Sequence, residues 1–195
     1  MIVKQSKKGI IFTLLFTVLF CVNIAIVTHV YAVQKQNTRI MVILDELDQL
    51  NNFTFTDEEL AEYEQEGIKD KRIAVLKAFF RRYDSPLYDY ATLIVQESDK
   101  NDLDHRLIPA IAMKESTACK FIPKNSYNCW GWGIYGNQIT RFRSYEEAIE
   151  TIAAGLKKHY VDKGYVTPEQ IMMKYNPNSD GSWAQGVNHV LGVLE

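Results

Sequence analysis

The sequence lacks several patterns on which familiar enzyme chemistries depend. It has no glycine-rich phosphate loop, no internal repeat and no low-complexity tract. It has four histidines, His29, His105, His159 and His189, and none is spaced near a serine or cysteine that resembles a nucleophile elbow. These absences argue against a phosphate-loop nucleotide enzyme, a repeat architecture and a serine or cysteine hydrolase.

Positive charge is also scarce beyond the N-terminus. The 195 residues include 22 basic and 24 acidic side chains, and three of the lysines lie within residues 1–9. Without residues 1–9 the chain has 19 basic and 24 acidic residues, which gives a net charge near −5. Nucleic acid is therefore not an expected partner.

One long apolar run is present, at residues 10–27, and only Thr13, Thr17 and Asn23 interrupt it. Its length is close to the roughly 20 residues that cross a bilayer. We expect residues 10–32 to form a transmembrane signal-anchor with residues 1–9 as its cytoplasmic basic flank, so that the rest of the chain is exported. The small residues within 30–32 leave a removable signal peptide as the alternative. A buried core helix is disfavoured because the run is apolar on every face.

Residues 33–71 are expected to form a juxtamembrane helix and a linker. Apolar residues recur at helical steps within 33–50, which makes this segment a candidate for self-association. The acid-rich stretch at 57–66 reads as a solvated helix or linker.

Residues 72–195 have the length and pattern of one packed, mainly α domain. Ser85 is a predicted helix N-cap with Pro86 at the first helical position. Between Trp130 and Phe142 the one strand-like stretch predicts a small β-hairpin that turns at residues 136–137. Three pairs have the spacing of capping boxes: Ser144 with Glu147, Thr167 with Gln170, and Ser182 with Gln185.

Glu115 is the main candidate for chemistry. It follows Ile108 and Ile111 at helical spacing on a predicted helix that starts near Asp104, so it should share the apolar face of that helix. Removal from water and the helix dipole both raise the pKa of a carboxyl group at a helix C-terminus, and a raised pKa suits a general acid. The alternative is an acid that a neighbour caps or that fraying exposes.

An aromatic, glycine-rich loop follows this helix. Beside a buried acid it fits a carbohydrate site, because aromatic rings stack on the C–H faces of sugars and amides bind hydroxyl or acetamido groups. Its glycines allow the backbone to approach a ligand closely. The alternative for the two tryptophans is core filling. The residues concerned are Tyr127, Asn128, Trp130, Gly131, Trp132 and Gly133.

Two of the three cysteines, Cys119 and Cys129, bracket the start of this loop. In an oxidising compartment they could form a disulfide, which would contribute on the order of 3 kcal/mol. Two free thiols are the alternative. A zinc site is disfavoured because no histidine is close to the pair in sequence, and no metal or cofactor is expected.

Four segments, in order, resemble the lytic transglycosylases and bacterial glucosaminidases of the lysozyme-like superfamily. Residues 110–116 (AIAMKES) resemble the helix that ends in a catalytic Glu followed by Ser. Residues 127–133 (YNCWGWG) resemble the glucosaminidase pattern Asn-Asn-Leu-Phe-Gly-Ile-Lys, and residues 141–149 and 175–183 resemble the later segments that complete the cleft. The resemblance covers residues 104–195.

The resemblance implies a lysozyme-like domain that cleaves β-1,4 bonds in peptidoglycan glycan strands. It implies that Glu115 is the general acid and that Tyr175 lies over the cleft as a second catalytic residue. The substrate-binding residues that we expect with them are Ser116, Tyr127, Asn128, Trp130, Gly131, Trp132 and Trp183.

The chain departs from the family in one respect. Only 12 residues separate Glu115 from Asn128, which leaves little room for a lobe with a second carboxylate, and Asp180 is the best remote candidate. We therefore expect Glu115 to act alone, with the substrate supplying the second group. An N-acetylglucosaminidase is the first prediction and a lytic transglycosylase the close alternative. A non-catalytic glycan-binding module and a structural assembly protein are the hypotheses from other classes.

Overall fold

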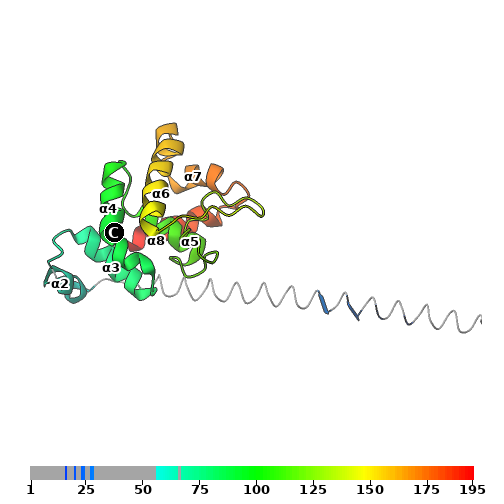
Figure 1. Ribbon diagram of the computed structural model, residues 1–195, viewed down its shortest axis with the longest axis horizontal. Coiled ribbons are helices and arrows are strands. Elements are labelled where there is room, and N and C mark those ends of the chain that lie inside the picture. The colour runs from blue at the N-terminus through cyan, green and yellow to red at the C-terminus, as the bar shows by residue number, and fades with distance from the viewer. Residues whose placement is uncertain (1–15, 17–19, 21–22, 25–26, 29–55, 66) are drawn as a thin grey trace, which may run out of the picture. The chain divides into compact units, whose positions relative to one another are not determined.

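The structure is a computed structural model that describes residues 16, 20, 23, 24, 27, 28, 56–65 and 67–195 (Figure 1). The chain divides into two compact units, Met1–Asn52 and Phe53–Glu195. The described residues of the first unit are helical and exposed. Most of the predicted signal-anchor at 10–32 and all of segment 33–50 lie outside the described residues. None of the helices that the described residues form is long and apolar enough to cross a membrane.

The second unit consists of helices and turns, as the predicted mainly-α class requires. Its first half contains α2 (Asp57–Gln65), α3 (Lys71–Arg82), the short 3-10 helix η1 (Pro86–Tyr90) and α4 (Ala91–Lys100). After α5 (Leu107–Ser116) a long loop leads to α6 (Tyr145–His159), η2 (Val161–Lys163), α7 (Pro168–Tyr175) and α8 (Ser182–Val193).

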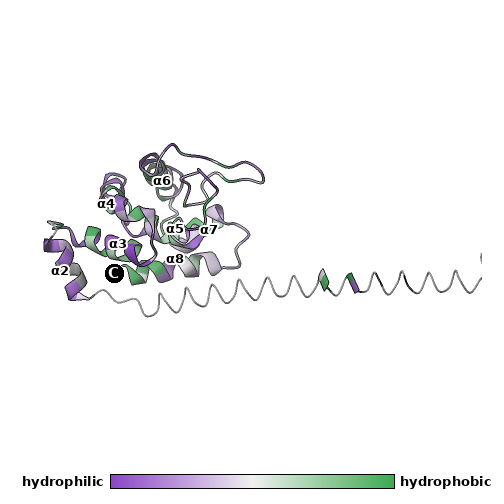
Figure 2. Cartoon of the chain, turned by 60° about the horizontal axis from the view of Figure 1, so that its bottom comes forward, coloured by the Kyte–Doolittle hydropathy of each residue, from purple (hydrophilic) through white to green (hydrophobic). Residues whose placement is uncertain are grey.

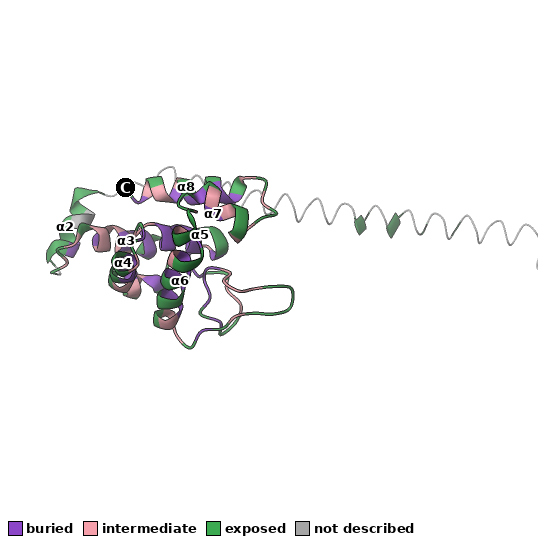
Figure 3. Cartoon of the chain, turned by 90° about the horizontal axis from the view of Figure 1, so that it is seen from above, coloured by how far each residue is buried: buried purple, intermediate pink, exposed green. Residues whose placement is uncertain are grey.

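The helix that carries Glu115 is the central one. Within α5 every residue except Lys114 and Glu115 is buried. This helix packs against α8 and α6, and Figure 3 shows it between them. A helix that is apolar on all faces needs such surroundings, because it has no polar face to turn to water. The start of α5 at Leu107 is three residues later than expected, and the side chain of Asp104 accepts a hydrogen bond from the Arg106 amide there.

The compact unit begins earlier than the predicted boundary at residue 72. The hydrophilic helix α2 (Figure 2) packs against α3 rather than forming a linker. The side chain of Tyr63 is only 1% exposed, and the guanidinium of Arg81 lies 4.9 Å from its ring centre. One buried aromatic residue in an otherwise acidic stretch therefore joins α2 to the domain.

Local capping signals position most of the other helices. Ser85 accepts a hydrogen bond from the Leu87 amide, with Pro86 in the first turn of η1. Thr167 and Gln170 form a complete capping box at the start of α7. Both of these starts are as predicted, and Ser144 likewise caps α6 by accepting a bond from the Glu147 amide.

The predicted cap at Ser182 is wrong. The N-cap of α8 is Gly181, which has a φ of 103°, and Ser182 is already within the helix. The amides near the helix start find other acceptors: Ser182 donates to the Asp180 carboxylate, and Trp183 donates to the Ser179 hydroxyl. The helix therefore starts without a hydroxyl at its N-cap.

The predicted β-hairpin between Trp130 and Phe142 is not supported, although the chain does turn at residues 136–137 as predicted. One isolated bridge joins Tyr135 to Gln138, and the described residues form no strand. The reason is that a side chain takes the backbone groups that a ladder would need. Asn128 donates to the carbonyls of Trp132 and Thr140 and accepts from the Trp132 amide.

Candidate active site

Glu115 lies in the last turn of α5, as predicted. The residue as a whole is exposed rather than buried in the core, while its carboxylate is partly buried at the hydrogen bond from Trp183. The helix ends at once, because Thr117 adopts a left-handed conformation and its amide turns back to the carbonyls of Ala112 and Met113. With Lys114, Glu115 is where an otherwise buried helix reaches water. It is thus a solvent-accessible acid on a rigid support.

The turn after α5 has an unusual backbone. Thr117, Ala118 and Cys119 are successive non-glycine residues with positive φ angles of 51°, 51° and 78°, and even single residues of this kind are uncommon. The hydroxyl of Ser85 donates to the carbonyl of Ala118 at 2.7 Å. Buried contacts therefore hold a conformation that the isolated chain would rarely adopt.

Ser116 and a disulfide bring the following loop back to the end of α5. Cys119 and Cys129 are bonded. The buried hydroxyl of Ser116 lies 2.8 Å from the carbonyl oxygen of Cys129 and accepts a hydrogen bond from the amide of Cys119. Ser116 thus stabilises this turn. It also lines the cavity at Glu115 described below, and its contact with substrate stays a prediction.

Asn128 and Trp130 were both predicted to line the sugar site. Asn128 is among the residues that line the cavity at Glu115, whereas Trp130 lines neither of the two cavities described below. Asn128 is 2% exposed, and its amide organises the loop as described above. Trp130 is fully buried, and its indole N–H donates to the carbonyl of Ile108 at 2.9 Å. Core filling, the alternative reading, is therefore correct for Trp130, which anchors the loop to the buried helix.

Gly131 is the point at which the loop meets the acid. Its φ is +62°, and a Cβ atom there would lie 3.0 Å from Oε2 of Glu115. A larger residue would be strained by its backbone and would press on the carboxylate. The approach predicted for this glycine was to a ligand, and the group that lies close to it in the structure is the carboxylate of Glu115.

Trp183 holds the other oxygen of the carboxylate. Its indole Nε1 donates to Oε1 of Glu115 at 2.6 Å, and its ring is only 2% exposed. A sugar therefore has little of this ring on which to stack, contrary to the predicted role. The surrounding protein desolvates Glu115 and raises its pKa above the ordinary value, whereas the Trp183 hydrogen bond and the charge of Lys114 act in the opposite direction.

Tyr175, at the end of α7, lies beside this pair. Its ring stacks on that of Trp183, with centroids 5.2 Å apart, and its hydroxyl donates to the carbonyl of Trp130. Burial, and next the charge of Glu115, raises the pKa of Tyr175 well above its usual value. The phenol is therefore held in its neutral form.

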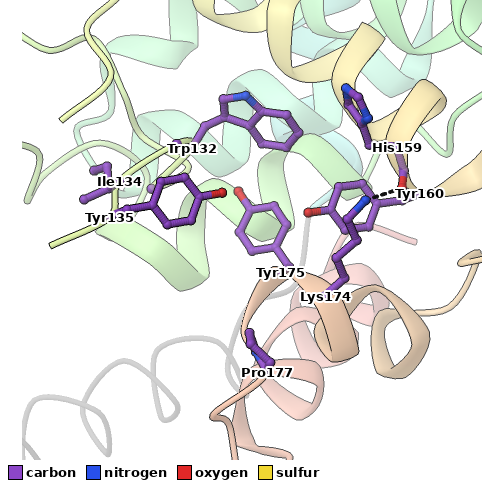
Figure 4. Close-up of a pocket in the computed structure, with 10 residues that line it drawn as sticks. Trp132, Ile134, Tyr135, His159, Tyr160, Lys174, Tyr175 and Pro177 are labelled. Carbon is purple, nitrogen blue, oxygen red and sulfur yellow. Dashed lines mark hydrogen bonds between the residues drawn. The ribbon is translucent and has the colours of Figure 1, made fainter. Parts of the chain in front are cut away.

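Two cavities meet at this point. The first, of about 360 Å³, is lined by Glu115 and by the exposed ring of Phe121. The second, of about 430 Å³, is shown in Figure 4, where Trp132, Tyr135, Tyr160 and Tyr175 surround it. The residues that line both are Gly131, Ile134 and Tyr175. Together they form a cleft with Glu115 in one part and aromatic side chains in the other.

The sequence did not reveal several residues of this cleft. Nothing in the sequence linked Tyr160, which directly follows α6, to the loop, and the fold places it against Trp132 and Tyr175. Lys174 and His159 line the second cavity, and the Lys174 ammonium donates to the His159 carbonyl (Figure 4). Conversely, Tyr127 lines neither cavity and packs edge-on against Tyr145.

Glu115 is the only acidic residue that lines either cavity in the described part of the chain. Asp180, the remote candidate for a second carboxylate, is exposed and accepts the hydrogen bond from the Ser182 amide. Residues 56–65 and 67–195 contain no group of three or more histidine, cysteine, aspartate or glutamate residues arranged to hold a metal ion. The chemistry that this cleft offers is that of one carboxyl group with a raised pKa.

Comparison of the chain with protein-family models, with curated proteins and with solved structures found no match.

Proposed function

We propose that the unit Phe53–Glu195 is a lysozyme-like cell-wall glycosidase that cleaves β-1,4 bonds of peptidoglycan, with Glu115 as its general acid. We further propose that it is exported and tethered to the membrane through residues 10–32. The observation that carries the proposal is the placement of Glu115 in an aromatic cleft. Its raised pKa keeps more of it protonated near neutral pH than an ordinary glutamate would be.

The reaction begins when Glu115 gives its proton to the leaving O4 as the C1–O4 bond breaks. No second carboxylate lines the described cleft, so the substrate supplies the group that attacks C1. In an N-acetylglucosaminidase this group is the acetamido oxygen, and the Glu115 carboxylate then takes a proton from the water that opens the intermediate. This is our first choice.

In a lytic transglycosylase the muramyl 6-hydroxyl takes the place of that water. Its oxygen bonds to C1 as the C1–acetamido oxygen bond of the intermediate breaks, and the Glu115 carboxylate takes its proton. The single carboxylate of the cleft favours neither route. The products separate them, because a transglycosylase leaves 1,6-anhydromuramic ends and a glucosaminidase leaves reducing N-acetylglucosamine ends. Mass spectrometry of digested sacculi shows which ends are present.

The test of catalysis is Glu115→Gln, which keeps the shape of the side chain and its ability to accept the Trp183 hydrogen bond. We expect release of fragments from purified sacculi to fall at least about 100-fold, because a general acid contributes that much. Glu150→Gln is the matched control, since Glu150 is an exposed residue of α6 that lines neither cavity.

Binding of the Glu115→Gln protein to sacculi should persist. If that variant digests sacculi at the wild-type rate, Glu115 is not the acid. If wild type and variant both bind glycan and neither cleaves it, the domain is a glycan-binding module.

A further inference from the structure

The contact between Trp183 and Glu115 joins two helices at the candidate active site. Trp183 comes from the first turn of α8, and Glu115 comes from the last turn of α5. The backbone amide of Trp183 is fixed by the Ser179 hydroxyl at 3.1 Å, and its ring is fixed by the stack on Tyr175. The indole N–H that reaches Glu115 thus has little freedom to move.

An indole N–H can only donate a hydrogen bond. Oε1 of Glu115 therefore accepts the hydrogen bond from the indole whether the carboxyl group is charged or neutral. When Glu115 is protonated, its carbonyl oxygen is a better acceptor than its hydroxyl oxygen, so the bond from the indole favours the proton on the other oxygen, Oε2. This is the oxygen that lies against Gly131, a residue shared by the two cavities.

We propose that Trp183 is a positioning residue that holds Oε1 of Glu115 and so makes Oε2 the atom that carries and delivers the proton. The role rests on the proposed function of Glu115. Trp183 acts through Glu115 rather than through the substrate, because its ring is almost completely buried. A fixed carboxyl orientation matters since proton transfer requires the acid within hydrogen-bond reach of the leaving oxygen.

Two other groups act on the same carboxylate. Lys114, from α5, favours the charged form of Glu115, and Tyr175, from α7, remains a neutral phenol beside it. The aliphatic part of Lys114 lies across Gly186 of α8, where a Cβ atom would be 2.8 Å from its Cδ. Neither group is changed by removing the indole N–H, so the effect of Trp183 can be measured separately.

The test is Trp183→Phe, which deletes the N–H and keeps an aromatic ring to stack on Tyr175. The Glu115 carboxyl carbon is titrated by NMR in the full chain without substrate, with Glu115→Gln used to assign its signal. Because the N–H stabilises the charged form, its loss should move the midpoint to higher pH. An unchanged midpoint overturns the proposal.

Trp130→Phe is the matched control, because it removes an indole N–H that is also buried but bonds to the backbone of Ile108. It should leave the Glu115 midpoint where it is, and a shift as large as that of Trp183→Phe overturns the proposal. If Trp183→Phe does not fold, benzothienylalanine at position 183 replaces the N–H by sulfur in a ring of almost the same shape. The same titration then decides.

Kinetics on a soluble glycan fragment supply the second readout. Trp183→Phe should lower kcat roughly 10-fold and leave KM unchanged. The pH above which the rate falls should move to a higher value, by as much as the Glu115 midpoint moves. A raised KM with that pH unchanged would make Trp183 a substrate contact and overturn the proposal. Because the titration needs no substrate, failure of the proposed function, seen as no cleavage by wild type, is distinguishable from failure of this inference.

Discussion

The ionisation of Glu115 in the cleft makes the stability of the fold depend on pH. Its pKa is raised in the folded protein by desolvation, so ionisation is less favourable there than in the unfolded chain. Below the pKa that Glu115 has in the unfolded chain, the group is protonated in both states, and its ionisation does not change the free energy of unfolding. As pH rises through the folded-state pKa, the folded state loses stability relative to a variant that cannot ionise.

Glu115→Gln should therefore be more stable than the wild type at neutral pH, and this advantage should shrink as the pH is lowered to about 4. Urea unfolding across that range measures the difference, with Glu150→Gln as the control for removal of an exposed charge on α6. An advantage that grows toward acid pH would show that the pKa of Glu115 is lowered instead.

For single side chains, the sequence predicted which kinds of residue lie near the cleft better than it predicted whether each side chain faces the cleft or the protein interior. It identified Glu115 at a helix end, because helical spacing bears on that position. It did not show what the side chains of Asn128 and Trp130 bind, since an amide or an indole can bind a sugar or a backbone carbonyl equally well. Which of these it does depends on whether the loop turns the side chain inward, and here the carbonyls of Trp132 and Ile108 took these donors.

Among the elements, the loop between α5 and α6 depends most on one covalent bond. The Cys119–Cys129 disulfide spans 10 residues and fixes the backbone next to Glu115. Replacing both cysteines by serine should cost about 3 kcal/mol in the free energy of unfolding. It should also reduce activity, because Gly131 would no longer be held against the carboxylate.

Urea unfolding followed by tryptophan fluorescence measures this loss, and digestion of sacculi measures the activity. Cys21→Ser is the control for removal of a sulfur that the disulfide does not use. Full stability and full activity in the double variant would show that hydrogen bonds such as that of Ser116 suffice to hold the loop.

Helix boundaries were predictable where the signal was local. Thr167 and Gln170 specify the start of α7 by themselves, since both halves of their capping box are within four residues. The pair Ser182 and Gln185 has the same spacing, but the left-handed Gly181 set the start of α8 instead. The hairpin failed for a longer-range reason, because Asn128 competes for backbone groups as far away as Thr140.

The extent of the domain gives a prediction for the chain as a whole. A fragment of residues 53–195 should unfold in one cooperative transition, because it contains the complete compact unit. A fragment of residues 72–195 lacks the buried ring of Tyr63 and should be less stable by about 2 kcal/mol or more. Urea midpoints of the two fragments provide the comparison, and equal values would mean that α2 is a linker after all.

The bond from Trp183 to Glu115 also sets an order of events during synthesis. The two residues are 68 positions apart. At typical rates of translation the acid is made about 3 to 14 s before its donor. The nascent chain therefore holds a glutamate with no indole partner until α8 follows, and its cleft is completed only by a late, long-range closure. The hydrogen bond that holds the Glu115 carboxylate is accordingly among the last contacts of this domain that can form during synthesis.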